Sequence, residues 1–89
     1  MKIKIELFGA AKDFSKEDCL EVTTTKQINI KELREKLLEL LKNSFPENTS
    51  YSEIVIKSAF CNENDEIVHD DYLILKDQKF CIIPPIGGG

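Results

Sequence analysis

Positive charge, paired cysteines and long apolar runs are all scarce in this sequence. Its 12 basic and 16 acidic residues give a formal net charge of −4, which argues against a nucleic-acid partner because phosphate contacts need a basic surface. No apolar run approaches the roughly 20 residues of a membrane-spanning helix, and the alternating first residues predict no signal peptide. The three cysteines, Cys19, Cys61 and Cys81, do not form a disulfide framework, so we expect a reduced, cytoplasmic chain.

Catalytic and metal-binding signals are equally sparse. A chain of 89 residues makes one domain with a modest core, which leaves little room for an internal active site. His69 stands in an acidic turn without a second cluster of ligands, so we expect no metal site. Each cysteine falls in an expected strand, where cysteine packs as a small hydrophobic residue.

The first half of the chain predicts two strands and a helix. Residues 2–8 alternate between apolar and polar side chains, which is the period of a half-buried strand, and residues 19–23 predict a second one. Asn29 and Glu32 have the spacing of a helix capping box, and Pro46 marks the end of that helix. The helix carries an apolar stripe on one side, made by Ile30, Leu33, Leu37, Leu40 and Leu41.

The second half predicts mainly strands. We expect a loop at 47–52, a strand at 54–61, a short strand at 67–68, a helical turn near 72–75 and a last strand at 80–83. One helix covers only one face of a sheet, so the predicted fold is α+β: a mixed sheet of about five strands with one main helix across one face. This domain spans residues 1–83, and residues 84–89 form an extended tail.

The tail, Pro84-Pro85-Ile86-Gly87-Gly88-Gly89, is the most distinctive segment. The prolines fix the backbone near an extended conformation, whereas three successive glycines present no side chains at all. Such an end suits insertion into a narrow tunnel of another protein, where it would deliver the carboxylate of Gly89.

Alternation along the strands also predicts a docking face. If Ile3, Ile5 and Leu7 face the helix, Phe8 lies on the opposite side of the sheet. If Phe80 and Ile82 are in the core, Ile83 lies outside, and by the same alternation Ala59 and Cys61 point inward. We therefore expect an exposed apolar patch beside the tail, of the kind that marks a partner surface, formed by Phe8, Phe60, Ile67 and Ile83.

Both ends of the sequence resemble a known family. FCIIPPIGGG resembles the C-terminus of the molybdopterin synthase small subunit, which ends in an apolar strand, Pro-Pro, an aliphatic residue, a small residue and Gly-Gly. ELFGAAKDF is similar to the first strand and loop of that family, with Lys12 where the family often has arginine. The middle, from about 24 to 56, matches only in its helix. The resemblance implies the ubiquitin-like β-grasp fold, and it adds Lys12 to the expected partner-binding residues.

The resemblance also implies a mechanism. An E1-like adenylyltransferase and sulfurtransferase would use ATP to adenylate the Gly89 carboxylate and then convert it to a thiocarboxylate. The tail, Pro84 to Gly88, would insert into the large subunit of molybdopterin synthase, where sulfur passes to cyclic pyranopterin monophosphate in molybdenum cofactor biosynthesis. The complex would be a heterotetramer. This chain would supply no catalytic side chain, bind no cofactor itself and be inert alone.

Three alternatives remain open. Sulfur carriers for thiamine thiazole synthesis or transfer-RNA thiolation also end in Gly-Gly, but they generally lack the Pro-Pro-aliphatic segment. A ubiquitin-like modifier would instead join its terminal carboxylate to lysines of other proteins. A β-grasp interaction module with an incidental tail is the third alternative.

Overall fold

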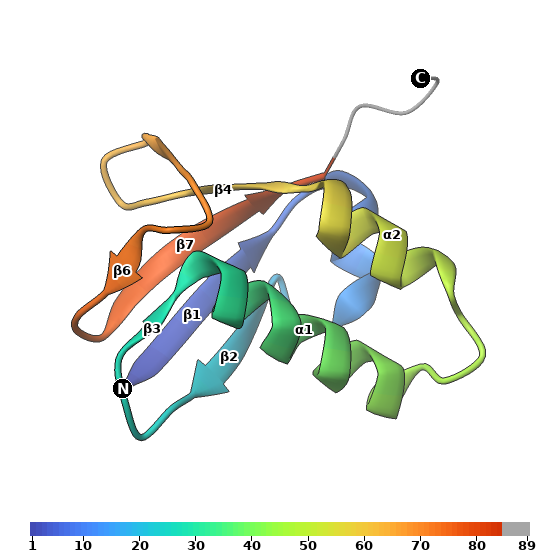
Figure 1. Cartoon of the computed structure of the whole chain (residues 1–89). Coiled ribbons are helices and arrows are strands. Elements are labelled where there is room, and N and C mark those ends of the chain that lie inside the picture. Colours follow the sequence, from blue (N-terminus) through green and yellow to red (C-terminus); the bar gives the residue numbers. More distant parts are fainter. Residues whose placement is uncertain (85–89) are drawn as a thin grey trace.

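The computed structural model describes residues 1–84, in which a long helix lies across one face of a mixed sheet (Figure 1). The elements in chain order are β1 (Lys2–Leu7), the 3-10 helix η1 (Gly9–Phe14), β2 (Cys19–Thr23), β3 (Ile28–Asn29), α1 (Ile30–Ser44), α2 (Ser50–Lys57), β4 (Ala59–Cys61), β5 (Ile67–Val68), β6 (Leu73–Ile74) and β7 (Gln78–Ile83).

The first and last strands lie side by side in the middle of the main sheet. Its order is β2-β1-β7-β4-β5, and β1 pairs with β7 in parallel, from Ile3 opposite Gln78 to Leu7 opposite Ile82. All the other pairs are antiparallel, and β3 and β6 form a separate two-stranded ladder. The predicted mixed sheet of about five strands is therefore confirmed.

The core lies between this sheet and α1. The predicted alternation in β1 is confirmed, since Ile3, Ile5 and Leu7 are buried and Lys2 and Lys4 are exposed. The predicted capping box is also present: Asn29 Oδ1 accepts from the Glu32 amide at 2.8 Å, and Glu32 Oε1 accepts from the Asn29 amide. The helix buries Ile30, Leu33, Leu37 and Leu41 against the sheet.

Arg34 ties α1 to α2 and β4. Its side chain is only 15% exposed, and Nη1 donates to the carbonyl oxygens of Val55 at 2.6 Å and Ser58 at 2.8 Å. The guanidinium carbon lies 5.0 Å from the centroid of the Phe60 ring. The positive charge therefore meets the carbonyls at the C-terminal end of α2, where the helix dipole favours a cation.

Residues 47–61 differ from the sequence prediction. The strand expected at 54–61 is wrong in its first half, because α2 occupies 50–57 and β4 is only three residues long. Tyr51, Ile54 and Val55 have the i, i+3, i+4 spacing of a helix stripe, and all three pack on the core. The Tyr51 ring lies 5.1 Å from both Phe14 and Phe45, so aromatic packing holds α2 against η1 and the end of α1.

Two smaller predictions also fail. Residues 73–74 form the strand β6 instead of a helical turn, because β3 supplies a partner through Ile28 opposite Ile74. The last strand begins at Gln78, two residues earlier than predicted, because its pairing with β1 extends down to Ile3.

Candidate partner-docking surface

The described chain ends at the C-terminal end of the central strand β7, where several apolar side chains meet. Because β1 and β7 are parallel neighbours, their C-terminal ends lie at the same end of the sheet. This brings Phe8 and Gly9 near Ile83 and Pro84. Gly9 has φ +54°, and a Cβ added there would lie 3.4 Å from Pro84 Cγ. The positive φ, which glycine adopts without strain, thus lets the chain turn from β1 into η1 beside Pro84.

The sheet face away from α1 carries one continuous row of side chains across all five strands. Cross-strand pairing places Cys19 of β2 opposite Glu6, Glu6 opposite Cys81, and Cys81 opposite Cys61 of β4, which in turn pairs with Ile67 of β5. Paired residues on adjacent strands share a face and touch one another. Sequence reasoning missed this row because the row depends on the register between strands, which local sequence does not encode.

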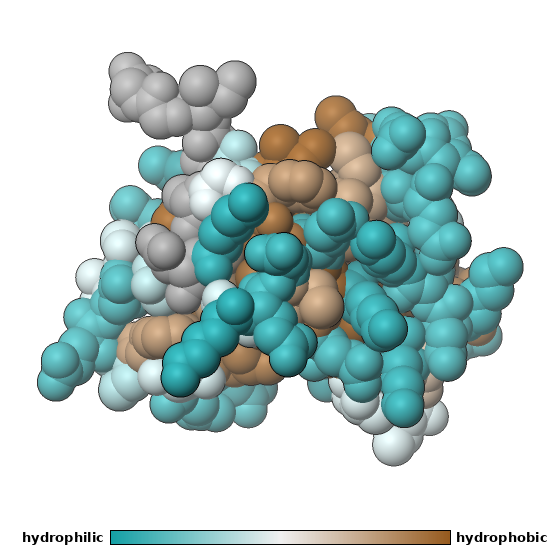
Figure 2. Space-filling model, turned by 180° about the vertical axis from the view of Figure 1, so that it is seen from behind, coloured by the Kyte–Doolittle hydropathy of each residue, from teal (hydrophilic) through white to brown (hydrophobic). Residues whose placement is uncertain are grey.

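The upper part of this face is apolar. Four side chains, which we call the outer patch, line an open depression of about 320 Å³ together with Asp65: Phe8, Cys61, Cys81 and Ile83. Phe8 is 42% exposed and Ile83 41%, and the neighbouring Ile67 is 62% exposed. Figure 2 looks at this side of the molecule and shows apolar surface near its upper edge, with hydrophilic side chains over much of the face below it. Exposed large apolar side chains next to one another are typical of a protein-binding surface.

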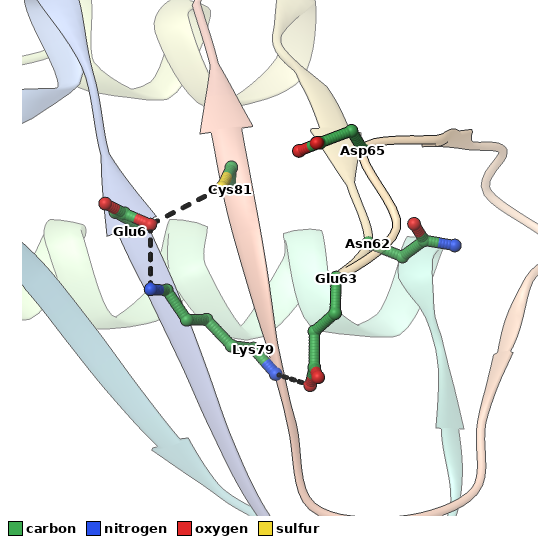
Figure 3. A pocket seen from close by; sticks show the side chains of 6 residues that line it. All are labelled: Glu6, Asn62, Glu63, Asp65, Lys79 and Cys81. Atoms are coloured by element: carbon green, nitrogen blue, oxygen red, sulfur yellow. Dashed lines mark hydrogen bonds and ion pairs between the residues drawn. The ribbon is translucent and has the colours of Figure 1, made fainter.

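A polar depression of about 400 Å³ adjoins the outer patch (Figure 3). Lys79 Nζ lies 3.0 Å from Glu6 Oε2, and the Lys79 backbone amide donates to Glu63 Oε1 at 3.0 Å. Glu63 is held there by a turn in which Asn62 Oδ1 accepts from the amides of Asn64 and Glu66. The turn is completed by Asp65 at φ +61°, a conformation that aspartate tolerates better than most residues.

The charges in this depression act on one another. The hydrogen bond from Lys79 lowers the pKa of Glu6, and the same bond raises the pKa of Lys79. Burial raises the pKa of Cys81, and its hydrogen bond to Glu6, with Sγ 3.6 Å from Oε2, raises it further. Cys81 is therefore a protonated thiol at neutral pH, at the border between the polar depression and the outer patch.

The structure exposes most of the residues predicted to form a docking face. Phe8, Ile67 and Ile83 are exposed on the side away from α1, and Lys12 is exposed on η1. The predicted outward position of Phe60 is wrong, because this residue is fully buried opposite Ile82 and Val68. Ala59 and Cys61 correspondingly lie on the outer face, where Cys61 is nevertheless buried and Ala59 is half-buried.

The size of the side chains could have given the correct orientation. Phe60 is the largest apolar residue of β4 and gains more from burial than Ala59 or Cys61 would. The predicted tail residues Pro85, Ile86, Gly87, Gly88 and Gly89 lie outside the described residues.

Among the side chains that the structure describes within residues 1–84, no group of three or more histidine, cysteine or acidic residues is placed to hold a metal ion. No helix within this range is both long and apolar enough to cross a membrane.

The element order and sheet topology define the ubiquitin-like β-grasp fold. Solved structures with similar folds include SAMP1 from Haloferax volcanii, with 13% identity, complete coverage of both chains and a TM-score of 0.69. A putative molybdopterin converting factor, subunit 1, from Pyrococcus furiosus is 18% identical, with 96% of this chain and 98% of that chain covered and a TM-score of 0.69.

The third structure is a complex of subunits 1 and 2 of the molybdopterin-converting factor from Helicobacter pylori. The matched chain is 23% identical, covered completely on both sides, with a TM-score of 0.57. No protein-family model and no curated protein matches the sequence. At these identities the likeness establishes the fold, and it confirms the β-grasp that the family resemblance implies.

Proposed function

We propose that this chain is a ubiquitin-like sulfur carrier, and that it serves as the small subunit of molybdopterin synthase. The observation that carries the proposal is the position of Pro84, which leaves the central strand β7 beside Phe8 and Ile83 and opens the segment Pro-Pro-Ile-Gly-Gly-Gly. Similar folds described as subunit 1 of molybdopterin converting factor support it.

The chemistry takes place at the carboxylate of Gly89. A carboxylate is a poor electrophile, so an E1-like enzyme transfers AMP from ATP to it, with release of pyrophosphate. A sulfur nucleophile then displaces AMP and leaves a thiocarboxylate. The large subunit supplies the catalytic side chains that pass this sulfur to cyclic pyranopterin monophosphate, while the present chain contributes the sulfur and its own docking surface.

The outer patch is the surface that the large subunit covers. Gly9, the neighbour of Phe8, lies against Pro84, and Phe8 shares a depression with Ile83, so a partner that takes the tail into a tunnel also reaches these two side chains. The adjacent depression adds Glu6, Glu63 and Asp65, three carboxylates for one lysine, which favours a partner with basic groups around its apolar contact.

Intact-mass analysis of the chain, produced with its activating enzyme, tests the proposal. We expect the mass to rise by the difference between sulfur and oxygen, with the change located at Gly89. Deletion of Gly89 removes both the mass change and molybdopterin synthesis. A Gly87→Ser variant is the matched control, because the resembled family tolerates a small polar residue there, and it keeps both.

Other outcomes separate the alternatives. A ladder of covalent protein adducts, detected by immunoblot of a tagged chain, identifies a modifier. Sulfur loading without loss of molybdoenzyme activity on gene deletion points to thiazole synthesis or transfer-RNA thiolation. If the chain without Gly89 still supports molybdopterin synthesis, the proposed mechanism is wrong.

A further inference from the structure

Two of the three cysteines lie directly opposite each other in the main sheet. Cys61 of β4 and Cys81 of β7 are an antiparallel register pair on the outer face. Directly opposite residues in antiparallel strands have Cα atoms about 4.5 or 5.5 Å apart, depending on the type of pair. Both values lie inside the range of roughly 4.4–6.8 Å that a disulfide spans. The register therefore places the Cα atoms of these two cysteines within the range that a disulfide spans.

The third cysteine is excluded by the same pairing. Cys19 belongs to β2, and Glu6 of β1 stands between it and Cys81 in the row. Two strand spacings of about 4.8 Å separate Cys19 from Cys81 by nearly 10 Å. Cysteines whose Cα atoms are more than about 7 Å apart cannot be bridged without backbone movement. In the folded chain only one of the three pairings is available.

Small molecules can reach this pair from the surface. Both thiols line the depression bounded by Phe8, Asp65 and Ile83, and Cys81 also borders the polar depression around Glu6 and Lys79. Cys81 is half-buried, whereas Cys61 is 9% exposed. A thiol reagent therefore meets Cys81 first and has Cys61 behind it.

We infer that Cys61 and Cys81 form a dithiol site that closes to a cross-strand disulfide by exchange with low-molecular-weight disulfides. The Cys81 sulfur loses its proton to water and attacks one sulfur of the reagent, which forms a mixed disulfide and releases one thiolate. The Cys61 thiol then loses its proton and attacks the Cys81 sulfur, which releases the second thiolate. The chain loses two electrons and two protons, and the reagent is reduced to two thiols.

This site goes beyond the sulfur-carrier function and does not depend on it. Its chemistry requires only the folded chain and the reagent, whereas sulfur loading requires an activating enzyme and Gly89. Closure would join two members of the outer patch, so the redox state of this pair would alter the surface that a partner meets.

Equilibration of the reduced, folded chain with mixtures of reduced and oxidised glutathione tests the inference. After alkylation of the remaining thiols, intact-mass analysis should show the loss of two hydrogens, and peptide mapping should show a Cys61–Cys81 link. The Cys19→Ala variant is the matched control and should close at the same glutathione ratio as the wild type. Cys61→Ala and Cys81→Ala should stop at the glutathione adduct.

Denaturant provides a second comparison, because an unfolded chain no longer holds one pair together. There we expect links among all three cysteines. The inference is overturned if native wild-type chain accumulates the glutathione adduct without closing, or if its links involve Cys19. It is equally overturned if Cys61→Ala or Cys81→Ala still loses two hydrogens. Sulfur loading of these variants at Gly89 is a separate readout, so either conclusion can fail alone.

Discussion

Truncation of Phe8 to alanine should weaken binding to the large subunit of molybdopterin synthase by about one to two orders of magnitude. A phenylalanine side chain buries about 150–250 Å² when fully covered, and 42% of Phe8 is exposed in the free chain, which leaves about 60–105 Å² for a partner to cover. At about 25 cal/mol per Å², this area corresponds to about 1.5–2.6 kcal/mol, or a 10- to 80-fold rise in Kd.

Isothermal titration of the purified large subunit with each variant measures this change. Leu75→Ala is the matched control, because Leu75 is 59% exposed but lies between β6 and β7, at the opposite end of the central strands from Phe8. It should bind as the wild type does. Thermal unfolding of each free chain identifies any loss of affinity that comes from a damaged fold.

A Kd that changes less than about threefold for a folded Phe8→Ala chain would refute the assignment of the outer patch as the docking surface. Equal losses for Phe8→Ala and Leu75→Ala would refute it as well, because the effect would not depend on location. Ile83→Glu extends the test by placing a charge where the contact should be dry, and it should abolish co-elution while leaving the circular dichroism spectrum unchanged.

Arg34→Met should lower the free energy of unfolding by about 3 kcal/mol in urea titrations, since it leaves buried carbonyls of Val55 and Ser58 without their charged donor. Asp70→Asn should lower it by less than about 1 kcal/mol, because the ion pair between Arg34 and Asp70 is exposed on the Asp70 side. Asn29→Ala should cost about 1 kcal/mol by the same assay, whereas Asn29→Asp retains the cap and most of the stability. In a chain whose only cysteine is Cys81, Glu6→Gln should lower the pKa of the thiol, because burial still raises this pKa but the hydrogen bond to the carboxylate is lost. The pH profile of alkylation by iodoacetamide should then move to lower pH, and a profile that stays in place or moves upward would contradict the role of Glu6.

Elements with a strong local pattern could be predicted from the sequence. The alternation of Lys2–Leu7 and the capping box of Asn29 and Glu32 are short-range signals, and the structure shows both. The segment from 50 to 61 was mispredicted because it is short and rich in β-branched residues, which fit a helix or a strand equally well until a partner is known. The helix is favoured here because it lets Tyr51 pack between Phe14 and Phe45. Both partners lie outside the segment, so the local sequence does not reveal these contacts.

Which residues of the candidate surface face outward could be predicted on the long strands, where the alternation of side chains is clear. The prediction was wrong on the short strand β4. Phe8 follows directly from the long alternation of β1, and Ile83 follows from that of β7. Phe60 lies in a strand of three residues, too short to fix which side chains face inward. The Cys61–Cys81 pair depends on the register between β4 and β7, which local sequence does not encode.

The parallel pairing of β1 with β7 has a mechanical consequence. A force applied at Pro84 along β7 would be carried by the whole β1–β7 ladder, from Ile3 to Ile82, with the antiparallel pairing to β4 on the other side. The hydrogen bonds of both ladders would be loaded together in shear and would not open one after another from an end. Strands loaded in this way resist unfolding better than strands that are peeled apart, so β7 stays paired while its C-terminal end is under tension.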